Sequence, residues 1–262
     1  MRRLLWLYRR CLRVHLRAVL EYRTGAILLA AAAVLTQLAG LIFLLTVFSH
    51  LPVLAGWKQW EVVCVYAMVI TAEGVCSLLF EGTWHLASMI NGGGLDYLLV
   101  RPMPVVLQLM SSAVGMNGLG NLTMGVVLLG AGLANVETDW TGLTVIWAFI
   151  LFMSAILVRL GINLAARAAS FWLLSPSSAL AYATQALGDL ARYPISVYGP
   201  HLQTVLTIVP VAFVRFFPAA YLFDRGPNGW LGAPTPMVAM ACLLIGGLVF
   251  RAGVSRYESA GH

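Results

Sequence analysis

The sequence predicts an all-α integral membrane protein, and three observations support this fold class. The chain has 262 residues, of which 60% are hydrophobic and 10% are charged. Soluble domains carry about 25% charged residues, so almost nothing is left here for a separate soluble domain. Long apolar blocks recur along the chain, and seven of its 16 Lys and Arg residues lie in the first 23 positions. This basic start, followed by apolar blocks, indicates membrane-surface binding and orientation rather than nucleic-acid binding.

Residues 1–24 are expected to form an amphipathic helix that lies in the plane of the lipid headgroups. At 100° per residue, apolar and basic side chains separate onto two faces. The apolar face holds Leu4, Leu5, Tyr8, Cys11, Leu12, Leu16 and Val19, and the basic face holds Arg2, Arg3, Arg9, Arg10, Arg13 and Arg17. The alternative is a solvated basic arm ahead of the first span. We expect no signal peptide, because the charged run is too long and the next apolar stretch is long enough to span.

The rest of the chain, 25–262, is predicted to be one transmembrane domain. Its apolar blocks cover about 26–48, 61–84, 104–134, 142–165, 169–188, 202–223 and 235–252. About 20 residues of helix cross the hydrocarbon core. Arginines near both termini place both ends of the chain inside, so the number of crossings is even. The weakest block, 202–223, contains Pro210, Arg215 and Pro218. We therefore predict six transmembrane helices and an external re-entrant segment at 202–223, where surrounding protein makes a broken helix tolerable.

The stretch from Ile90 to Pro102 is a polar, glycine-rich break between two predicted spans. Three consecutive glycines allow the backbone to bend there. Asp96 and Arg101 then frame a short apolar run, and Pro102 suits the first turn of the next helix. A loop, a short helix and a helix start between two spans form a natural docking surface for a cytosolic partner.

The pattern in this stretch, Ile90-x-x-Gly93-x-Leu95-Asp96-x-x-Leu99-x-Arg101-Pro102, resembles the short permease subunits of bacterial type-2 ATP-binding-cassette exporters. Two later stretches agree with it in order: residues 192–199, followed by Pro210 and 217–219, and residues 256–261. The resemblance covers essentially the whole chain. The family often has Arg where this chain has Asn91, so one charge of the docking loop is missing here.

The resemblance implies a six-span permease of the bacterial plasma membrane, with both termini in the cytoplasm. It implies a second permease copy or a sister permease as partner, and two cytosolic ATPase subunits that bind ATP and Mg²⁺. The first cytosolic loop would carry the coupling helix, and the coupling residues would be Ile90, Gly93, Leu95, Asp96, Leu99, Arg101 and Pro102. The chain itself is expected to hold no cofactor, because its one lysine, Lys58, lies in no phosphate loop. Multidrug efflux is one activity of such permeases, and drugs, lipids, peptides and glycans all remain open as cargo.

Charged and polar residues inside the predicted spans are the other candidate functional residues. Glu73 lies near the middle of the second span, where an ionised carboxylate costs at least about 2.5–3.5 kcal/mol. With no basic residue expected at its depth, Glu73 either lines a translocation path for cationic cargo or is a protonated packing residue. Asn117 and Asn121 are also candidates for that path, although such side chains more often join helices by hydrogen bonds. Glu81 and Arg159, at similar estimated depths, form a candidate ion pair.

Two other classes of function remain open on the residues alone. An ion-coupled carrier or channel subunit would favour internal repeats and paired charges at mid-membrane, and only Glu73 supports it. A membrane-embedded lipid enzyme would require clustered His, Asp or Ser, which the sequence lacks. The four cysteines and five histidines are scattered, so we expect no metal site and no catalytic residues.

Overall fold

The computed structural model describes residues 2–51, 53–54, 56–137, 140–173, 179–190, 195–225 and 229–258. Its α-helices are α1 Arg2–Glu21, α2 Arg23–His50, α3 Gln59–Phe80, α4 Leu86–Asn91, α5 Asp96–Leu99, α6 Val105–Met110, α7 Asn117–Asn135, α8 Gly142–Ala168, α9 Ala179–Leu190, α10 Pro200–Ile208, α11 Ala212–Leu222 and α12 Thr235–Arg256. Strands β1 Val53–Leu54 and β2 Trp57–Lys58 form a short antiparallel hairpin. Short 3₁₀ turns occupy Glu81–His85, Ala169–Phe171, Ile195–Val197 and Gly229–Gly232.

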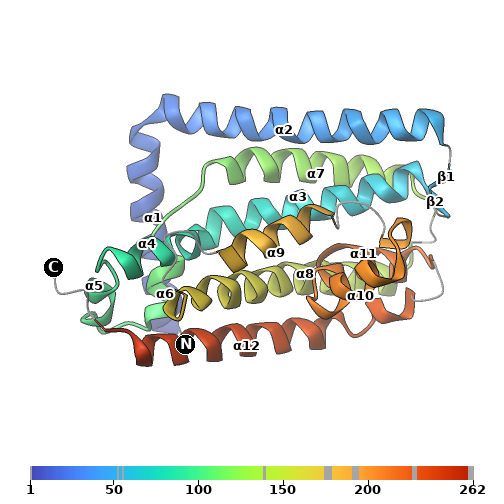
Figure 1. Cartoon of the computed structure of the whole chain (residues 1–262). Coiled ribbons are helices and arrows are strands. Elements are labelled where there is room, and N and C mark those ends of the chain that lie inside the picture. The colour runs from blue at the N-terminus through green and yellow to red at the C-terminus, as the bar shows by residue number, and fades with distance from the viewer. Residues whose placement is uncertain are drawn as a thin grey trace.

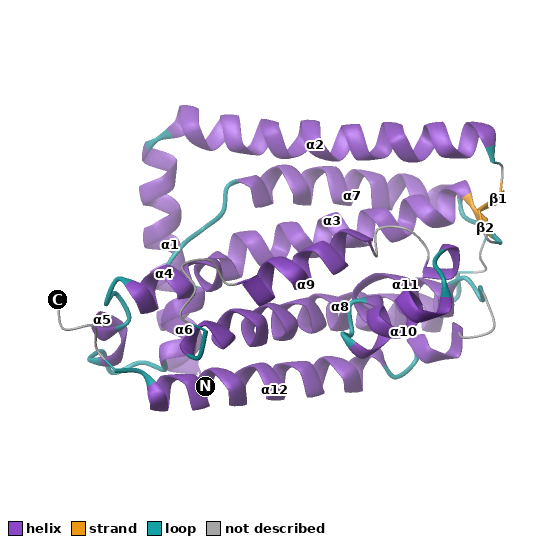
Figure 2. Cartoon of the chain, viewed as in Figure 1, coloured by secondary structure: helices purple, strands orange, loops and turns teal. Residues whose placement is uncertain are grey.

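The long helices run side by side in one bundle, in which α3 lies between α7 and α8 (Figure 1). Helix makes up almost all of the described chain, apart from the small β hairpin and the connecting loops (Figure 2). Helices α4, α5 and α6 lie at one end of the bundle, which we call the α5 end, together with α1 and the end of α12. The β hairpin, α10 and α11 lie at the opposite end, which we call the hairpin end.

Among the described residues, five helical segments are long and apolar enough to cross a membrane: Arg23–His50, Gln59–Asn91, Asn117–Asn135, Gly142–Phe171 and Thr235–Arg256. The predicted all-helical membrane fold is therefore confirmed. The span expected over 104–134 begins later, at Asn117, because the chain leaves the helix after Met110. The break is fixed by the backbone N–H of Gly115, which donates to the carbonyl oxygen of Ser77 on α3.

The span expected over 169–188 is not one continuous helix. Its first described residues form a 3₁₀ turn and its last part is α9, which has 12 residues. Such a helix is about 18 Å long, too short for a hydrocarbon core of roughly 30 Å. The block 202–223 forms α10 and α11, which are bent by 106° to one another. The break between them contains Pro210, which has no backbone N–H to continue a helix.

Helix α1 has the two faces that the sequence predicts. Tyr8 packs against Phe80 with ring centroids 6.5 Å apart, and other residues of the apolar face contact the bundle. The arginines of the opposite face are exposed at Arg3, Arg9, Arg10, Arg13 and Arg17. The helix runs across the α5 end at a steep angle to α2 (Figure 1). Its place in the lipid headgroup region stays a prediction.

Glycines set two especially close helix contacts. A Cβ atom on Gly74 of α3 would lie 2.6 Å from the backbone nitrogen of Leu122, so α7 approaches α3 closely at this level. A Cβ atom on Gly161 of α8 would lie 2.5 Å from the carbonyl carbon of Cys242 on α12. Small residues permit this close approach in a lipid environment, where packing rather than water exclusion drives association. Helices α3 and α7 therefore form one tight pair, and α8 and α12 form another.

Candidate functional site

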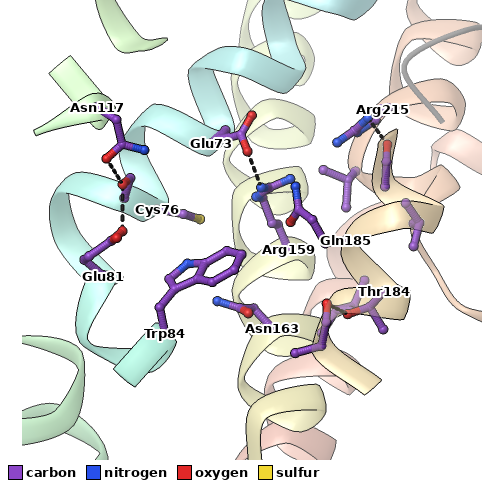
Figure 3. Close-up of a pocket in the computed structure, with 16 residues that line it drawn as sticks. Glu73, Cys76, Glu81, Trp84, Asn117, Arg159, Asn163, Thr184, Gln185 and Arg215 are labelled. Carbon is purple, nitrogen blue, oxygen red and sulfur yellow. Dashed lines mark hydrogen bonds and ion pairs between the residues drawn. The ribbon is translucent and has the colours of Figure 1, made fainter. Parts of the chain in front are cut away.

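A polar cavity of about 260 Å³ lies inside the bundle. Helices α3, α7, α8, α9 and α11 contribute its walls, and Figure 3 shows the side chains that converge on it. Two carboxylates and two guanidinium groups line it, from Glu73, Glu81, Arg159 and Arg215. With both acids ionised, their charges sum to zero. The cavity therefore offers positively charged hydrogen-bond donors and negatively charged acceptors within a membrane-spanning bundle.

The central contact of this cavity is an ion pair between α3 and α8. Arg159 Nη2 donates to Glu73 Oε1 at 3.0 Å, and the two side chains are 14% and 18% exposed. An ionised group in this position is tolerable when it is paired, because pairing offsets part of the desolvation cost. The expectation that Glu73 has no basic residue at its depth is therefore wrong.

The predicted partner of Arg159 was Glu81, whereas in the structure Arg159 pairs with Glu73. Both α3 and α8 begin at the hairpin end, at Gln59 and Gly142. At 1.5 Å per residue, Arg159 lies about 26 Å along its helix, Glu73 about 21 Å along α3 and Glu81 about 33 Å. Arg159 is thus closer in depth to Glu73.

Glu81 belongs to a separate hydrogen-bonded group that joins α3 to the start of α7. The Ser77 hydroxyl lies 2.7 Å from Glu81 Oε2 and 3.0 Å from Asn117 Oδ1 (Figure 3). Asn117 therefore lines the cavity, as expected for a candidate path residue, but it also fixes the contact between two helices. Ser77 was not among the predicted residues, because a single serine in an apolar helix carries no distinctive pattern.

Asn121 does not line this cavity. Its Oδ1 accepts a hydrogen bond of 3.0 Å from Gln37 Nε2 on α2, and Tyr66 donates to the same glutamine at 2.9 Å. These contacts join α2, α3 and α7 through buried polar groups. The geometry favours the interpretation of Asn121 as a link between helices.

The end of α8 nearest the α5 end carries a second polar contact group. Asn163 Nδ2 donates to the Thr83 hydroxyl at 3.1 Å, and Arg167 Nε donates to Asn163 Oδ1 at 3.3 Å. The Arg167 guanidinium also lies over the Trp84 ring, 3.7 Å from its centroid. These contacts tie α8 to the 3₁₀ turn that leads into α4, and hence to the loop at 90–102.

Residues from α9 and α11 complete the cavity and were not predicted as site residues. Arg215 on α11 is almost fully buried and donates from Nη1 to the carbonyl oxygen of Gly188 on α9. Thr184 and Gln185 also face the cavity (Figure 3). Arg215 was the one signal in the sequence that could have indicated this part of the cavity, because an arginine inside an apolar block requires polar partners. The sequence does not say which helix provides it.

The loop at 90–102 forms a compact surface at the α5 end. Ile90 and Leu95 are buried in an apolar cluster with residues of α6, α8 and α12. The backbone of Gly93 has φ +68, which suits glycine, and its carbonyl accepts from the Asp96 N–H. Gln108 Nε2 donates to the carbonyl of Leu98 at 2.9 Å. The loop is therefore held in place from behind by its apolar side.

The opposite side of this loop is open to solvent. Tyr97 is 73% exposed and Val100 is 83% exposed. Leu99, Arg101 and Pro102 are also exposed. Of the predicted coupling residues, the structure thus puts Leu99, Arg101 and Pro102 on the surface, whereas Ile90 and Leu95 support the loop from within.

The comparison with protein families decides the identity of the chain. A model described as ABC-2 family transporter protein matches residues 34–261. The chain belongs to the ABC-2 transporter family. No curated protein and no solved structure matches it.

This ABC-2 protein is a multi-pass membrane protein, and the resemblance inferred from its motifs is confirmed. ABC-2 permeases are not catalytic, and they generally pair with ATPase subunits. The description of the family does not identify a transported substrate, so it does not support a role in multidrug efflux. Among the described residues, no group of three or more His, Cys, Asp or Glu side chains could hold a metal ion. Two predicted motif segments, 192–194 and 259–261, lie outside the described residues.

Proposed function

We propose that this ABC-2 protein is the permease subunit of a bacterial exporter. It forms the translocation path with a second copy or a sister permease. Two cytosolic ATPase subunits, which bind ATP and Mg²⁺, drive the cycle through the loop at 90–102. Family membership supports the class of function, and the observation that carries the coupling role is the exposed face of this loop.

That face has the composition expected of a docking surface. Tyr97 and Val100 offer exposed apolar area, and Arg101 offers a charge that forms directed hydrogen bonds. Tyrosine and arginine are enriched among the residues that dominate binding energy at interfaces. Leu95 on the other side of the loop is fully buried, and this packing makes the surface rigid. A rigid surface can pass a movement of the ATPase subunits on to the transmembrane helices.

The charge distribution supports a cytoplasmic α5 end. The exposed arginines of α1, together with Arg101, Arg251 and Arg256, gather at this end. Basic residues near span ends are retained on the cytoplasmic side. Both termini are then cytoplasmic, and α10 and α11 form an external re-entrant pair.

The polar cavity is our candidate for the polar wall of the path, with Glu73 and Asn117 as lining residues. The paired state of Glu73 changes the cargo it favours. A carboxylate neutralised by Arg159 gives no preference for cations, and Glu81 and Arg215 bring one charge of each sign to the cavity. We therefore propose cargo that is polar or amphipathic, without selection for positive charge. A charge pair inside the bundle is also a feature that an ion-coupled carrier would favour, but family membership supports the ATP-driven permease.

Arg101→Ala and Asp96→Ala test the coupling role. Loss of a dominant interface residue costs more than about 1 kcal/mol, so transport and permease-stimulated ATP hydrolysis should fall roughly tenfold for Arg101→Ala. Insertion and the unfolding temperature should stay unchanged for this exposed side chain. Asp96→Ala should reduce coupling too, with some loss of local order, because the Asp96 carboxylate lies close to Tyr257 beyond the end of α12. Burial, and after it this carboxylate, raises the pKa of Tyr257.

Arg251→Ala is the matched control, because Arg251 is also exposed on the last helix near the α5 end but lies outside the loop. It should retain full coupling. Normal stimulation of the ATPase by both Arg101→Ala and Asp96→Ala would remove the coupling assignment.

A further inference from the structure

A second cavity, apolar and about 470 Å³ in volume, lies near the hairpin end. We call it the α7–α8 groove. Cys64 and Met68 of α3 form its buried floor, and Leu133 of α7 and Phe149 of α8 are among its exposed walls. Trp140, in the connection between α7 and α8, also lines it. This groove lies apart from the polar cavity, which has no lining residue in common with it.

The groove follows from the two tight helix pairs. Gly125 and Gly132 draw α7 onto α3, since a Cβ atom on either would meet Thr71 or Cys64. Gly161 and Gly246 draw α8 onto α12 in the same way. Helices α7 and α8 are consecutive in the chain, but each packs mainly on a different partner. The space between them is therefore left open, with α3 as its floor.

The side chains that line the groove cannot hold ordered water molecules. Its lining is aliphatic, aromatic or sulfur-containing side chains, with Cys64 and Trp140 as the most polar members. A water molecule needs two to four polar partners to be held in a cavity. Most of its lining residues belong to helices that are long and apolar enough to cross a membrane, and Phe149 is 64% exposed. What meets this groove in a bilayer is hydrocarbon.

The length and width of the groove suit a narrow apolar occupant. From Val145 to Phe152 its wall runs along eight residues of α8, or roughly 10 Å. A single acyl chain is narrow enough to enter it.

The end of the groove near the bundle surface is polar, as an amphiphile requires. Glu137, three residues before Trp140, pairs with Lys58, and both side chains are more than half exposed. Arg225, two residues after the lining residue Phe223, pairs with Glu61 at 2.7 Å. Charges of both signs therefore stand where a zwitterionic or anionic headgroup would lie, and Trp140 is a residue type that favours the membrane interface.

We propose that the α7–α8 groove binds one acyl chain of a bilayer phospholipid, with the headgroup beside Lys58 and Arg225. The occupant is a resident lipid that fills the gap between the two helix pairs. This inference does not rest on the proposed transport function, because it uses only the membrane setting and the shape of the groove.

Photolabelling of the full-length protein in phospholipid nanodiscs tests this proposal. The probe is a phosphatidylethanolamine with a photoactivatable diazirine on one acyl chain, and cross-links are mapped by mass spectrometry. We expect labels to concentrate on the floor and walls, at Met68 and Phe152. Ala148→Trp, which fills the groove, should lower this labelling about tenfold, because it displaces several methylene groups.

Leu143→Trp is the control, because Leu143 lies on the exposed side of α8 outside the groove lining. It should leave the labelling unchanged. Ala148→Phe provides a smaller filling substitution if Ala148→Trp unfolds, and elution as a single species on gel filtration checks both variants.

Three outcomes would overturn the proposal. Labels spread evenly over the exposed faces of α2 and α12, with no response to Ala148→Trp, would mean ordinary contact with bulk lipid. Equal loss of labelling in Leu143→Trp would mean that the variants act through general disturbance. An introduced cysteine at Ala148 that forms a disulfide-linked dimer in a background without the native cysteines would assign the groove to a second copy.

Discussion

Helices α2 and α3 are both long, apolar spans, but they occupy opposite environments. In its most apolar window, α2 has 11% of its residues buried, whereas the span that begins with α3 has 78%. Helix α3 contacts α7, α8 and α11, and α2 contacts mainly α7. The central helix contains Glu73 and, just beyond it, Glu81, while α2 has no acidic residue. Hydrophobicity therefore identifies a membrane span, but it does not indicate where in the bundle that span lies.

The physical reason is that lipid tails and apolar side chains are almost equivalent surroundings for a leucine. Burial of an apolar residue against another helix therefore leaves little trace in composition. Polar and small residues carry the information instead, because they are costly or useless against lipid. In α3 they are Glu73 and Gly74, and they mark the contacts with α8 and α7.

The largest expected effect on stability comes from breaking the ion pair of α3. Glu73→Gln keeps the shape of the side chain but leaves the Arg159 charge uncompensated inside the bundle. We expect a loss of about 3 kcal/mol in the free energy of unfolding, measured by denaturation in detergent micelles. The double variant Glu73→Leu/Arg159→Leu should recover more than half of that loss, since it removes both charges.

Two results would contradict this prediction. A stable Glu73→Gln protein would mean that the pair contributes nothing to the fold. A double variant that is less stable than Glu73→Gln would mean that Arg159 is supported by groups other than Glu73.

The next effect in size concerns the close contact between α3 and α7. Gly74→Leu adds a side chain where a Cβ atom alone would lie 2.6 Å from a backbone nitrogen. Overpacking of this kind costs about 2 kcal/mol or more, because a backbone cannot move aside by itself. Thermal unfolding of the purified protein measures the loss. Gly130→Leu on α7 is the control, with nothing within 4 Å of the added Cβ, and similar losses in both variants would refute the tight α3–α7 pairing.

The smallest effect is expected on α2. Leu35 is 66% exposed, so Leu35→Ala should change the free energy of unfolding by less than about 0.5 kcal/mol. The same denaturation series provides the measurement. If Leu35→Ala lowers the free energy of unfolding by more than about 1 kcal/mol in the membrane-reconstituted protein, a second polypeptide covers this face of α2. The contrast between α2 and α3 would then hold only for the isolated chain.

The fold class could be predicted from the sequence because composition and block length determine it. The segments 104–134 and 169–188 were delimited wrongly, because each contains a short polar break that was taken as part of an apolar block. Ser111 and Ser112 follow α6, and the sequence after Phe171 includes Ser175-Pro176-Ser177-Ser178. By contrast, Pro210 marks the bend between α10 and α11, and the block that contains it was set apart correctly from the continuous spans.

The candidate site could be predicted only in part. We identified Glu73, Glu81 and Arg159 only from the free-energy cost of placing a charged side chain inside the membrane. Charged residues within a span are rare and usually have a structural or functional role. Their pairing could not be derived, since it depends on the relative depth and rotation of two helices. In the loop, polar residues and glycines marked a break between two helical segments, but Leu95 and Val100 look alike in sequence. The structure alone separates the buried supporting residue from the exposed one.

The most direct test of the account is whether the exposed face of the loop at 90–102 touches an ATPase subunit. A photo-cross-linking amino acid is placed at Val100 in the permease, co-expressed with its cognate ATPase subunit in intact cells. The control position is Val53, which is exposed at the hairpin end. The account predicts a permease–ATPase adduct from Val100 and none from Val53. No adduct from Val100, or an adduct from Val53, would contradict it.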